Sequence, residues 1–267
     1  LIIGEAGTGK TLSIELIERH FNEGILSGGS STIKSLVPSF KSTTPNPGLL
    51  IVSIIFAFVD EFLSIIVRTK SDDENRGSAL AAMNEMLEHK IRDCGSGNGK
   101  ITGQMTARGI FTSNFLQNNY HHDLQAVCSH LDNPFLSRLL IYIINGETEK
   151  INLHYSEEEK FTEIEEPPID SEVIAAVVTY LQTVSTTYDT KRVIEIYKRL
   201  QKNIPKFTRE IFRRFKHHLH CMLDGLIKLR CINTRETTFI AIEMDYVCLE
   251  DLGEEIIQSW RRNVEYE

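Results

Sequence analysis

The sequence predicts an α/β protein, with a three-layer core around a parallel sheet and a smaller, mainly α-helical unit after it. Three observations lead to this prediction. An apolar stub at residues 1–3 runs into a glycine-rich turn and then an amphipathic helix over residues 11–21. A nearly continuous apolar and β-branched stretch covers residues 48–59, as expected of a strand buried on both faces. Helical periodicity dominates the second half, in stretches at 173–181, 189–201, 207–230 and 245–262.

The glycine-rich turn has a complete GxxxxGK[ST] pattern between the expected strand and helix, and reads Gly4-Glu5-Ala6-Gly7-Thr8-Gly9-Lys10-Thr11. This context is the one in which such a pattern forms a phosphate-binding loop. Its glycines allow backbone N–H groups to turn toward a phosphate, and the helix adds the positive end of its dipole. Lys10 is expected to contact phosphate oxygens and Thr11 to bind Mg²⁺. The sequence therefore predicts a nucleoside-triphosphate site; the alternative is a turn that binds no ligand.

Composition and charge suit an intracellular enzyme core, cytoplasmic or nuclear. The 267 residues can form one large domain or two smaller ones. With 29 basic and 37 acidic residues the formal net charge is −8, so nucleic-acid contact would require a local basic surface. Five scattered cysteines without CxxC spacing indicate a reducing compartment. No apolar run is long enough to cross a bilayer, and we expect no membrane partner. Because Leu1 lies inside an expected strand, we expect the sequence to be a fragment of a longer chain.

An acidic pair, Asp60-Glu61, directly follows the apolar stretch 48–59. Open α/β sheets bind their ligands at the carboxyl ends of the strands. Asp60 is therefore expected to bind Mg²⁺, and Glu61 to orient and help deprotonate an attacking water. The alternative is an acidic pair that only caps a strand.

Four further segments follow in order. A helix with one buried face is expected over residues 78–90 and two short strands around a glycine-rich turn over 90–106. A strand over 107–114 ends in the polar residue Asn114, and a turn leads into another apolar strand over 133–145.

Taken in this order, the segments resemble the ATPase module of the minichromosome maintenance (MCM) family, the AAA+ replicative helicases. The resemblance covers about residues 1–147. It rests on the phosphate-binding loop and on these stretches: Gly28–Thr32, Asp60-Glu61-Phe62, Ala82–Lys90, Ala107–Asn114 and Phe135–Ile141. It implies a P-loop AAA+ core that binds ATP and Mg²⁺, followed by a helical lid.

The resemblance also implies roles for single residues. Asn114 would be sensor 1, which helps to hold the attacking water, and Arg138 would be an arginine finger in the nucleotide site of the next subunit. The subunits would form a ring, expected to be hexameric. Lys90, Arg92 and Lys100 on the hairpin would contact DNA. The alternatives are a turn cap for Asn114, an ordinary surface charge for Arg138 and solvated hairpin charges for the other three.

The chain departs from the family after the acidic pair, where Leu63-Ser64 replaces the family's Asp-Lys. ATP hydrolysis is therefore a firmer expectation than helicase action. One alternative function is a nucleotide-switched oligomeric adaptor or regulator that unwinds nothing. Another is the P-loop domain of a mobile-element replication protein that shares only AAA+ ancestry with MCM proteins.

The composition changes after residue 147. Residues 148–168 are acidic and end in Pro167-Pro168, which predicts a linker. Residues 169–267 are expected to form the helical lid, and a winged-helix element within it is an open alternative because residues 237–242 look β-like. The lid's sensor 2 arginine would be Arg209, Arg213 or Arg214, with Arg209 slightly preferred. His217 and Cys221 share a helix face, but no second ligand pair accompanies them, so zinc is not expected.

Overall fold

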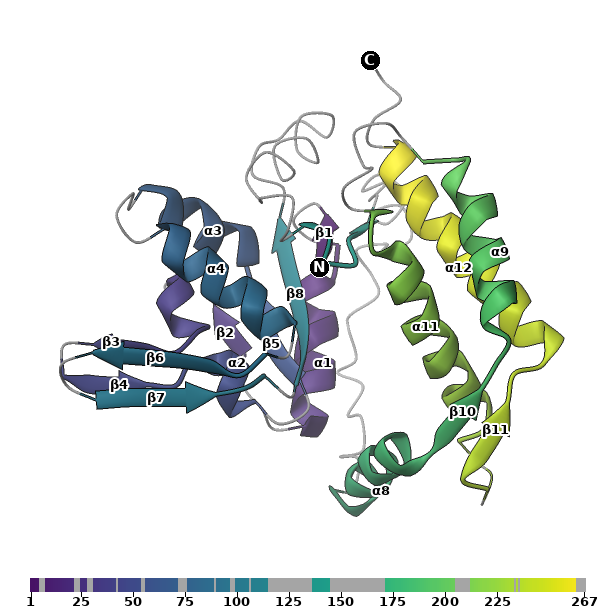
Figure 1. Ribbon diagram of the computed structural model, residues 1–267, viewed down its shortest axis with the longest axis horizontal. Helices are drawn as coiled ribbons and strands as arrows, with labels where there is room; N and C mark the ends of the chain where they lie inside the picture. The colour runs from purple at the N-terminus through teal and green to yellow at the C-terminus, as the bar shows by residue number, and fades with distance from the viewer. Residues whose placement is uncertain are drawn as a thin grey trace, which may run out of the picture.

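The fold is described from a computed structural model (Figure 1). The described residues are 1–4, 8–21, 25–27, 31–41, 43–53, 56–71, 76–88, 90–96, 99–105, 107–114, 136–144, 171–204, 212–232, 234 and 236–262. The expected acidic linker at 148–168 lies outside them, as do Glu5, Ala6 and Gly7 of the phosphate-binding loop.

The core contains a five-stranded sheet in the order β2-β5-β8-β1-β9. Its strands are β1 (Ile2–Gly4), β2 (Ile25–Ser27), β5 (Phe56–Asp60), β8 (Arg108–Asn114) and β9 (Tyr142–Ile144). Every neighbouring pair runs parallel, which confirms the α/β prediction. Because β8 lies between β1 and β5, the carboxyl ends of three strands meet at one edge of the sheet.

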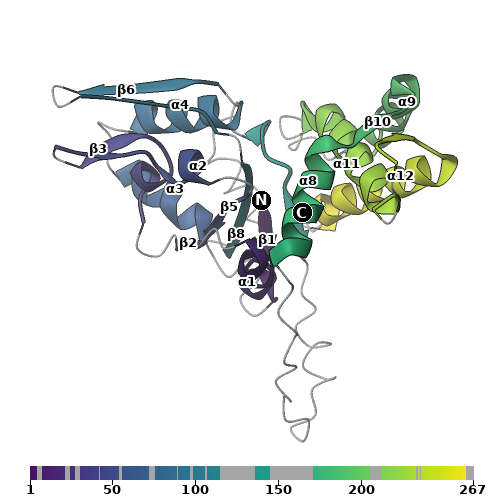
Figure 2. The same ribbon diagram turned by 90° about the horizontal axis from the view of Figure 1, so that it is seen from below.

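Helices cover both faces of this sheet. Phe111 of β8 stacks on Phe62 of α3 (Phe62–Ser71), with ring centroids 4.6 Å apart. Side chains alternate along a strand, so Thr112 points to the opposite face, which α1 (Lys10–Phe21) covers. In Figures 1 and 2 the strands lie between α1 on one side and α3 with α4 (Arg76–Leu87) on the other. The core is therefore three-layered, as predicted.

The prediction of one strand over residues 48–59 is wrong for its first half. Residues Leu49–Val52 form the short helix α2, and the strand β5 begins at Phe56. Gly48 has a φ of 81°, which an L side chain rarely adopts, and its carbonyl accepts from Ile51 N (3.1 Å) to close a helical turn. Leu50 is fully buried within this turn. A short apolar run does not distinguish a buried helical turn from a buried strand, which explains the error.

Two antiparallel hairpins project from the core, side by side in Figures 1 and 2. The hairpin of β6 (Arg92–Ser96) and β7 (Gly99–Gly103) confirms the prediction for residues 90–106. The other pairs β3 (Ser39–Lys41) with β4 (Thr44–Asn46), after the 3₁₀ turn η1 (Ile33–Ser35), and was not predicted. The predicted helix 78–90 is confirmed as α4, but α4 ends at Leu87, so Ile91, the last apolar position of the helical pattern 80, 83, 87 and 91, lies beyond it and is 70 % exposed.

The second half is mainly helical, as predicted. Its helices are α8 (Ser171–Thr183), α9 (Thr190–Gln201), α11 (Phe215–Arg230) and α12 (Glu243–Arg262). Helices α9, α11 and α12 pack together around buried aliphatic side chains, among them Val193, Leu200, Leu219, Leu223 and Leu249. Strands β10 (Ser185–Thr187) and β11 (Thr238–Ile240) pair in parallel, so the described part of this half contains no antiparallel wing.

Trp260, near the end of α12, contacts the sheet and so joins the helical half to the core. Its side chain is fully buried, and its Nε1–H donates to the Ile141 carbonyl oxygen at 2.9 Å. Ser259 Oγ also accepts from Ile143 N at 3.4 Å. Helix α12 thus packs directly against β9.

Replacing Trp260 with phenylalanine is expected to destabilise the protein by about 2 kcal/mol, because a buried carbonyl loses its donor and a smaller ring leaves space. Thermal unfolding followed by circular dichroism measures the effect. Met244→Ala, at a side chain 61 % exposed on the same helix, is the control and should change little. An unfolding temperature of Trp260→Phe equal to that of the control would contradict the role given to Trp260.

Candidate functional site

The candidate site lies where β1, β5 and β8 end. Gly4, the last residue of β1, is level with Asn114, the last residue of β8. Val59 is level with Phe111, so Asp60 at the end of β5 lies beside Thr112. The topology therefore brings the glycine-rich turn, the acidic pair and Asn114 to the same edge of the sheet, as the sequence predicted.

The described part of the turn holds a buried lysine. Gly9 has a φ of 78°, and α1 begins at the next residue, Lys10. Lys10 is only 5 % exposed, and its Nζ donates to Thr8 Oγ1 at 3.0 Å. At Gly4 a Cβ atom would lie 3.0 Å from the Ile144 carbonyl oxygen and 3.2 Å from Thr8 Oγ1. Glycine at position 4 thus permits the close approach of the turn to β9.

Asp60 connects three elements of the core. Thr11 Oγ1 of α1 lies 3.3 Å from both carboxylate oxygens of Asp60, and Thr112 Oγ1 of β8 donates to Oδ1 at 2.6 Å. A hydroxyl and a carboxylate held together are oxygen ligands of the kind that Mg²⁺ accepts. The pair predicted to bind the metal is therefore brought together, and its donor atoms fit that ion. Among the described residues, including those of this site, no group of three His, Cys, Asp or Glu side chains could hold a metal ion.

Glu61 is held in an unusual conformation. Its φ of 53° lies in the left-handed region, which costs of order 1–3 kcal/mol for a residue with a side chain. Asn114 Nδ2 donates to one carboxylate oxygen, and Ser64 Oγ donates to the other at 3.3 Å. The two residues expected to act on an attacking water, Glu61 and Asn114, are thus in direct contact.

Thr112 and Ser64 also contact the carboxylates of this site, although neither was predicted from the sequence. Thr112 is fully buried and holds Asp60, and its position two residues before Asn114 places both side chains on one face of β8. Ser64 lies three residues after Glu61, at the start of α3, where a side chain can reach back toward the preceding residue. The alternation and the spacing were available in the sequence. The pairing with a particular carboxylate required the structure.

Arg138 is not part of this group of residues. It precedes β9, and the N-terminal amine of Leu1 donates to the Leu140 carbonyl oxygen at 2.7 Å, so Arg138 lies toward the amino-end side of the sheet. Its side chain is 12 % exposed and forms an ion pair with Glu88. Arg138 therefore lies near the amino ends of the strands, whereas Asp60 and Asn114 lie at the carboxyl ends.

Glu88 binds three cations, and we call Glu88, Lys90, Arg138 and Arg214 the Glu88 cluster. Besides Arg138, Lys90 Nζ lies 2.5 Å from Glu88 Oε2, and Arg214 Nη2 lies 2.9 Å from Oε1. Hydrogen bonds from Lys90 and Arg214, followed by that from Arg138, lower the pKa of Glu88 to about 2, although burial opposes the shift. Arg214, a sensor 2 candidate, thus forms an ion pair with Glu88 of the core. Arg213 is exposed, and the preferred candidate Arg209 lies outside the described residues.

This lowered pKa predicts a pH-dependent contribution to stability. Because the pKa of Glu88 is lower in the folded protein than its ordinary 4.5, the carboxylate stabilises the fold fully above about pH 4.5 and loses this effect as the pH falls toward about 2. The difference in unfolding temperature between the natural protein and Glu88→Gln should therefore be larger at about pH 7 than at about pH 3. The other carboxylates titrate in both proteins, so their effects on the unfolding temperature cancel in this difference. Equal differences at the two pH values would contradict the ion-pair geometry.

Two of the three cations predicted to contact DNA, Lys90 and Lys100, have acidic neighbours. Lys100 Nζ lies 2.8 Å from Asp93 Oδ2 on the exposed hairpin, and Lys90 belongs to the Glu88 cluster. Arg92 begins β6, and its side chain is not among those described. The structure therefore leaves DNA contact by these residues a prediction.

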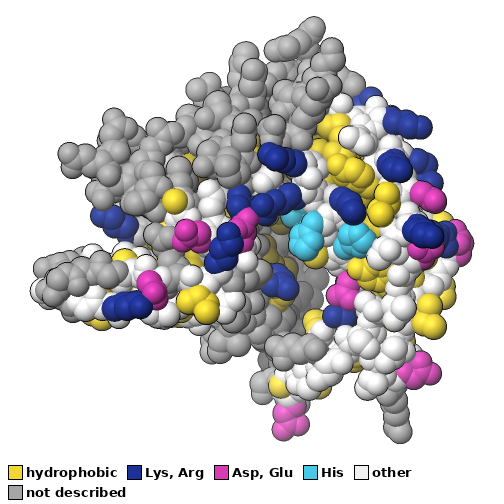
Figure 3. Space-filling view, viewed as in Figure 1, with side chains coloured by type: hydrophobic (Ala, Val, Ile, Leu, Met, Phe, Trp, Pro, Cys, Tyr) yellow, Lys and Arg dark blue, Asp and Glu magenta, His cyan; other side chains and the backbone are white. Residues whose placement is uncertain are grey.

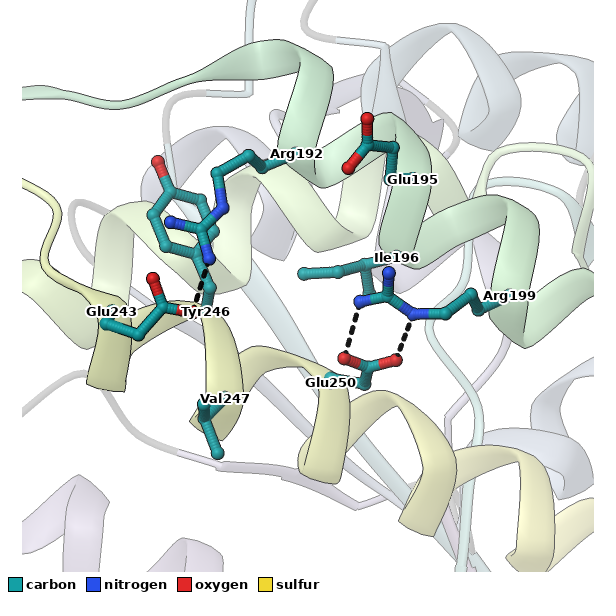
Figure 4. A pocket seen from close by; sticks show the side chains of 8 residues that line it. All are labelled: Arg192, Glu195, Ile196, Arg199, Glu243, Tyr246, Val247 and Glu250. Carbon is teal, nitrogen blue, oxygen red and sulfur yellow. Dashed lines mark hydrogen bonds and ion pairs between the residues drawn. The ribbon is translucent and has the colours of Figure 1, made fainter.

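A small pocket between α9 and α12 lies away from the strand ends (Figure 4). Arg199 donates twice to Glu250, at 2.5 and 2.6 Å, and Arg192 donates to Glu243 at 2.6 Å while its guanidinium covers the Tyr246 ring. These ion pairs join α9 to α12. Their charges compensate each other, so we assign the pocket a role in helix packing.

Comparison with protein-family models gives no match for this chain, and comparison with curated proteins gives none either. Among the residues described, no helix is sufficiently long and apolar to span a membrane.

Proposed function

We propose that the protein binds ATP together with Mg²⁺ and hydrolyses it, as a AAA+ ATPase similar to the MCM helicases. The observation that supports this proposal most is the meeting of Thr11, Asp60, Glu61 and Asn114 at the ends of neighbouring parallel strands, beside the buried Lys10. Chemistry on a phosphoryl group mainly requires positioning and neutralisation of charge, which such a set of side chains supplies.

Each residue has a role in this proposal. Lys10 and the backbone of residues 4–11 bind the phosphate oxygens, and Thr11 with Asp60 holds the metal. Mg²⁺, when bound, neutralises negative charge on the phosphate oxygens. Glu61 accepts a proton from the attacking water, and Asn114 positions that water and the Glu61 carboxylate.

The larger assembly is part of the same proposal. Residues 1–147 are the ATPase core and residues 169–267 its lid. Subunits form a ring, with Arg138 facing the nucleotide of the neighbouring copy and DNA in contact with Lys90, Arg92 or Lys100. The location of Arg138 on the amino-end side supports action in a neighbouring site rather than in its own.

A nucleotide-switched adaptor that unwinds nothing is the second candidate. The pairing of Lys90 and Lys100 with carboxylates of the same chain favours it, because these cations are already compensated. In this function ATP organises an oligomer, and no force acts on DNA.

Phosphate release with and without single-stranded DNA, together with a strand-displacement assay, tests the proposal and separates the two functions. A motor is expected to show ATP turnover that DNA stimulates, with displacement of the annealed strand. Turnover without displacement indicates the adaptor. Absence of turnover at every protein concentration contradicts both hydrolytic functions.

A further inference from the structure

Thr112 is a polar residue in the buried part of strand β8. Its side chain is fully buried. A buried hydroxyl costs free energy unless it forms a hydrogen bond, and valine has nearly the same shape without that cost. The hydroxyl of Thr112 donates to Asp60 Oδ1 at 2.6 Å. Its presence at this position is therefore explained by the contact with Asp60, not by packing of the sheet.

The hydrogen bond from Thr112 is the shorter of the contacts that hold the Asp60 carboxylate. A length of about 2.5–2.7 Å is typical of a hydroxyl that donates to a charged carboxylate. Thr11 Oγ1, in contrast, lies 3.3 Å from both carboxylate oxygens, so its one proton is shared between two long contacts. Because Thr112 is β-branched, its χ1 angle is restricted and the donating oxygen is itself held in place. Strand β8 thus fixes the carboxylate more firmly than α1 does.

These contacts leave acceptor sites on Asp60 for a metal ion. A carboxylate has about four such sites, and Thr112 and Thr11 donate one proton each. Asp60 is partly exposed and Thr11 is exposed, so solvent reaches both side chains. Mg²⁺ is commonly bound through one or two carboxylates together with substrate phosphates. The single carboxylate of Asp60 therefore suits Mg²⁺ bound with a nucleotide.

Mg²⁺ and Ca²⁺ differ in how well they tolerate a misplaced ligand. Mg²⁺ requires nearly ideal octahedral geometry at about 2.0–2.1 Å, whereas Ca²⁺ accepts oxygen ligands at about 2.3–2.6 Å in flexible geometry. Loss of a hydrogen bond that orients a metal ligand typically lowers metal affinity or activity by about 10- to 100-fold. A carboxylate that turns more freely should therefore weaken binding of Mg²⁺ more than binding of Ca²⁺.

We propose that Thr112 is a positioning residue that holds Asp60 in the orientation Mg²⁺ requires, and that its hydroxyl makes the nucleotide site prefer Mg²⁺ to Ca²⁺. The inference rests on the proposed function. It adds to that function a fully buried residue that determines which divalent ion supports nucleotide binding.

Two variants of Thr112 separate its hydroxyl from its packing. Thr112→Val removes the hydroxyl and keeps the shape, whereas Thr112→Ser keeps the hydroxyl and removes a methyl group. The measurement is the affinity for a fluorescent, slowly hydrolysed ATP analogue in Mg²⁺, in Ca²⁺ and with both ions chelated, so it requires no turnover. The natural protein is expected to bind the analogue more tightly in Mg²⁺ than in Ca²⁺.

In Thr112→Val we expect the affinity in Mg²⁺ to fall by about 10- to 100-fold and the affinity with both ions chelated to stay within about 2-fold. The affinity in Ca²⁺ should fall less than the affinity in Mg²⁺, because Ca²⁺ tolerates a reoriented carboxylate. Thr112→Ser should retain the natural preference for Mg²⁺, although the space left by the methyl group lowers its unfolding temperature.

Thr186→Val is the matched control. Thr186 lies on β10 of the helical half, and its Oγ1 donates to Asp224 Oδ1 at 2.5 Å. The substitution therefore removes the same kind of hydrogen bond from a strand outside the candidate site. This variant should bind the analogue like the natural protein under all three conditions.

Divalent ions can also act through carboxylates on the protein surface. Figure 3 shows that most Asp and Glu side chains on the drawn face lie beside Lys or Arg side chains, and Asp93 with Lys100 is one such ion pair. A neighbouring cation weakens the attraction of a carboxylate for a divalent ion. Equal ionic strength in the three conditions keeps the screening of these pairs equal, so a difference between Mg²⁺ and Ca²⁺ reports on the nucleotide site.

Three results would overturn the inference: no preference of the natural protein for Mg²⁺ over Ca²⁺, equal losses of affinity in the two ions in Thr112→Val, or an affinity of Thr112→Val in Mg²⁺ equal to that of Thr186→Val. Loss of the preference in Thr112→Ser would also count against the hydroxyl. Failure of the proposed function is distinguishable, because the natural protein would then bind no analogue, or bind it equally with and without Mg²⁺.

Discussion

Lys10→Ala is expected to lower the affinity for ATP with Mg²⁺ by about 10- to 100-fold, because a hydrogen bond between charged groups contributes about 1.5–3 kcal/mol. The side chain is 5 % exposed and held beside Thr8, so its ammonium is positioned before any ligand binds. Alanine is a good helix former and should leave α1 intact. Titration with a fluorescent ATP analogue measures the loss.

Lys191→Ala is the matched control for this variant, since Lys191 is an exposed lysine in the first turn of another helix, α9. The control should bind nucleotide like the natural protein. Equal affinity of Lys10→Ala and the control would remove the lysine, and with it the phosphate-binding role of the turn, from the proposal.

Glu61→Gln is expected to reduce ATP turnover by about 10²–10⁴-fold while nucleotide binding persists, because the amide cannot accept the proton of the attacking water. Glutamine has the same length as glutamate, so a side-chain oxygen can still accept from Asn114 or Ser64. ATP should then remain bound without being hydrolysed, and assembly of subunits should become stronger. Single-turnover phosphate release and size measurement with ATP report the two effects.

Glu254→Gln, at an exposed glutamate on α12, controls for the loss of a negative charge and should keep full turnover. If Glu61→Gln hydrolyses ATP as fast as this control, Glu61 has no part in proton transfer, and its left-handed backbone conformation needs another explanation.

The sequence predicted the sheet well where a strand is long or ends in a recognisable residue. Strands β5 and β8 end at Asp60 and Asn114, as expected. The hairpin of β3 and β4 and the strand β2 were missed, because a strand of three residues contains too little alternation to be detected from periodicity alone. The run before β5 became helical because Gly48 closes a turn, and hydrophobicity alone could not indicate this.

The candidate site was predictable to the extent that its residues lie next to strand ends. Asp60 and Asn114 end strands, Lys10 and Thr11 begin the helix that comes after β1, and parallel topology brings such positions together. Thr112 contacts Asp60 because of the register between β5 and β8. Glu88 contacts Arg214 because the helical half packs against the core. Glu88 in particular meets Arg214 across 126 residues of sequence, a distance at which no local pattern carries information.

Equilibrium titration of the natural protein with a slowly hydrolysed ATP analogue, in the presence of Mg²⁺ and again with the ion chelated, addresses nucleotide binding most directly. We predict saturable binding, with one nucleotide per chain, that weakens strongly when Mg²⁺ is removed, because the ion beside Thr11 and Asp60 would neutralise negative charge on the phosphates. Absence of saturable binding of adenine and guanine nucleotides with Mg²⁺ present would contradict the proposed function.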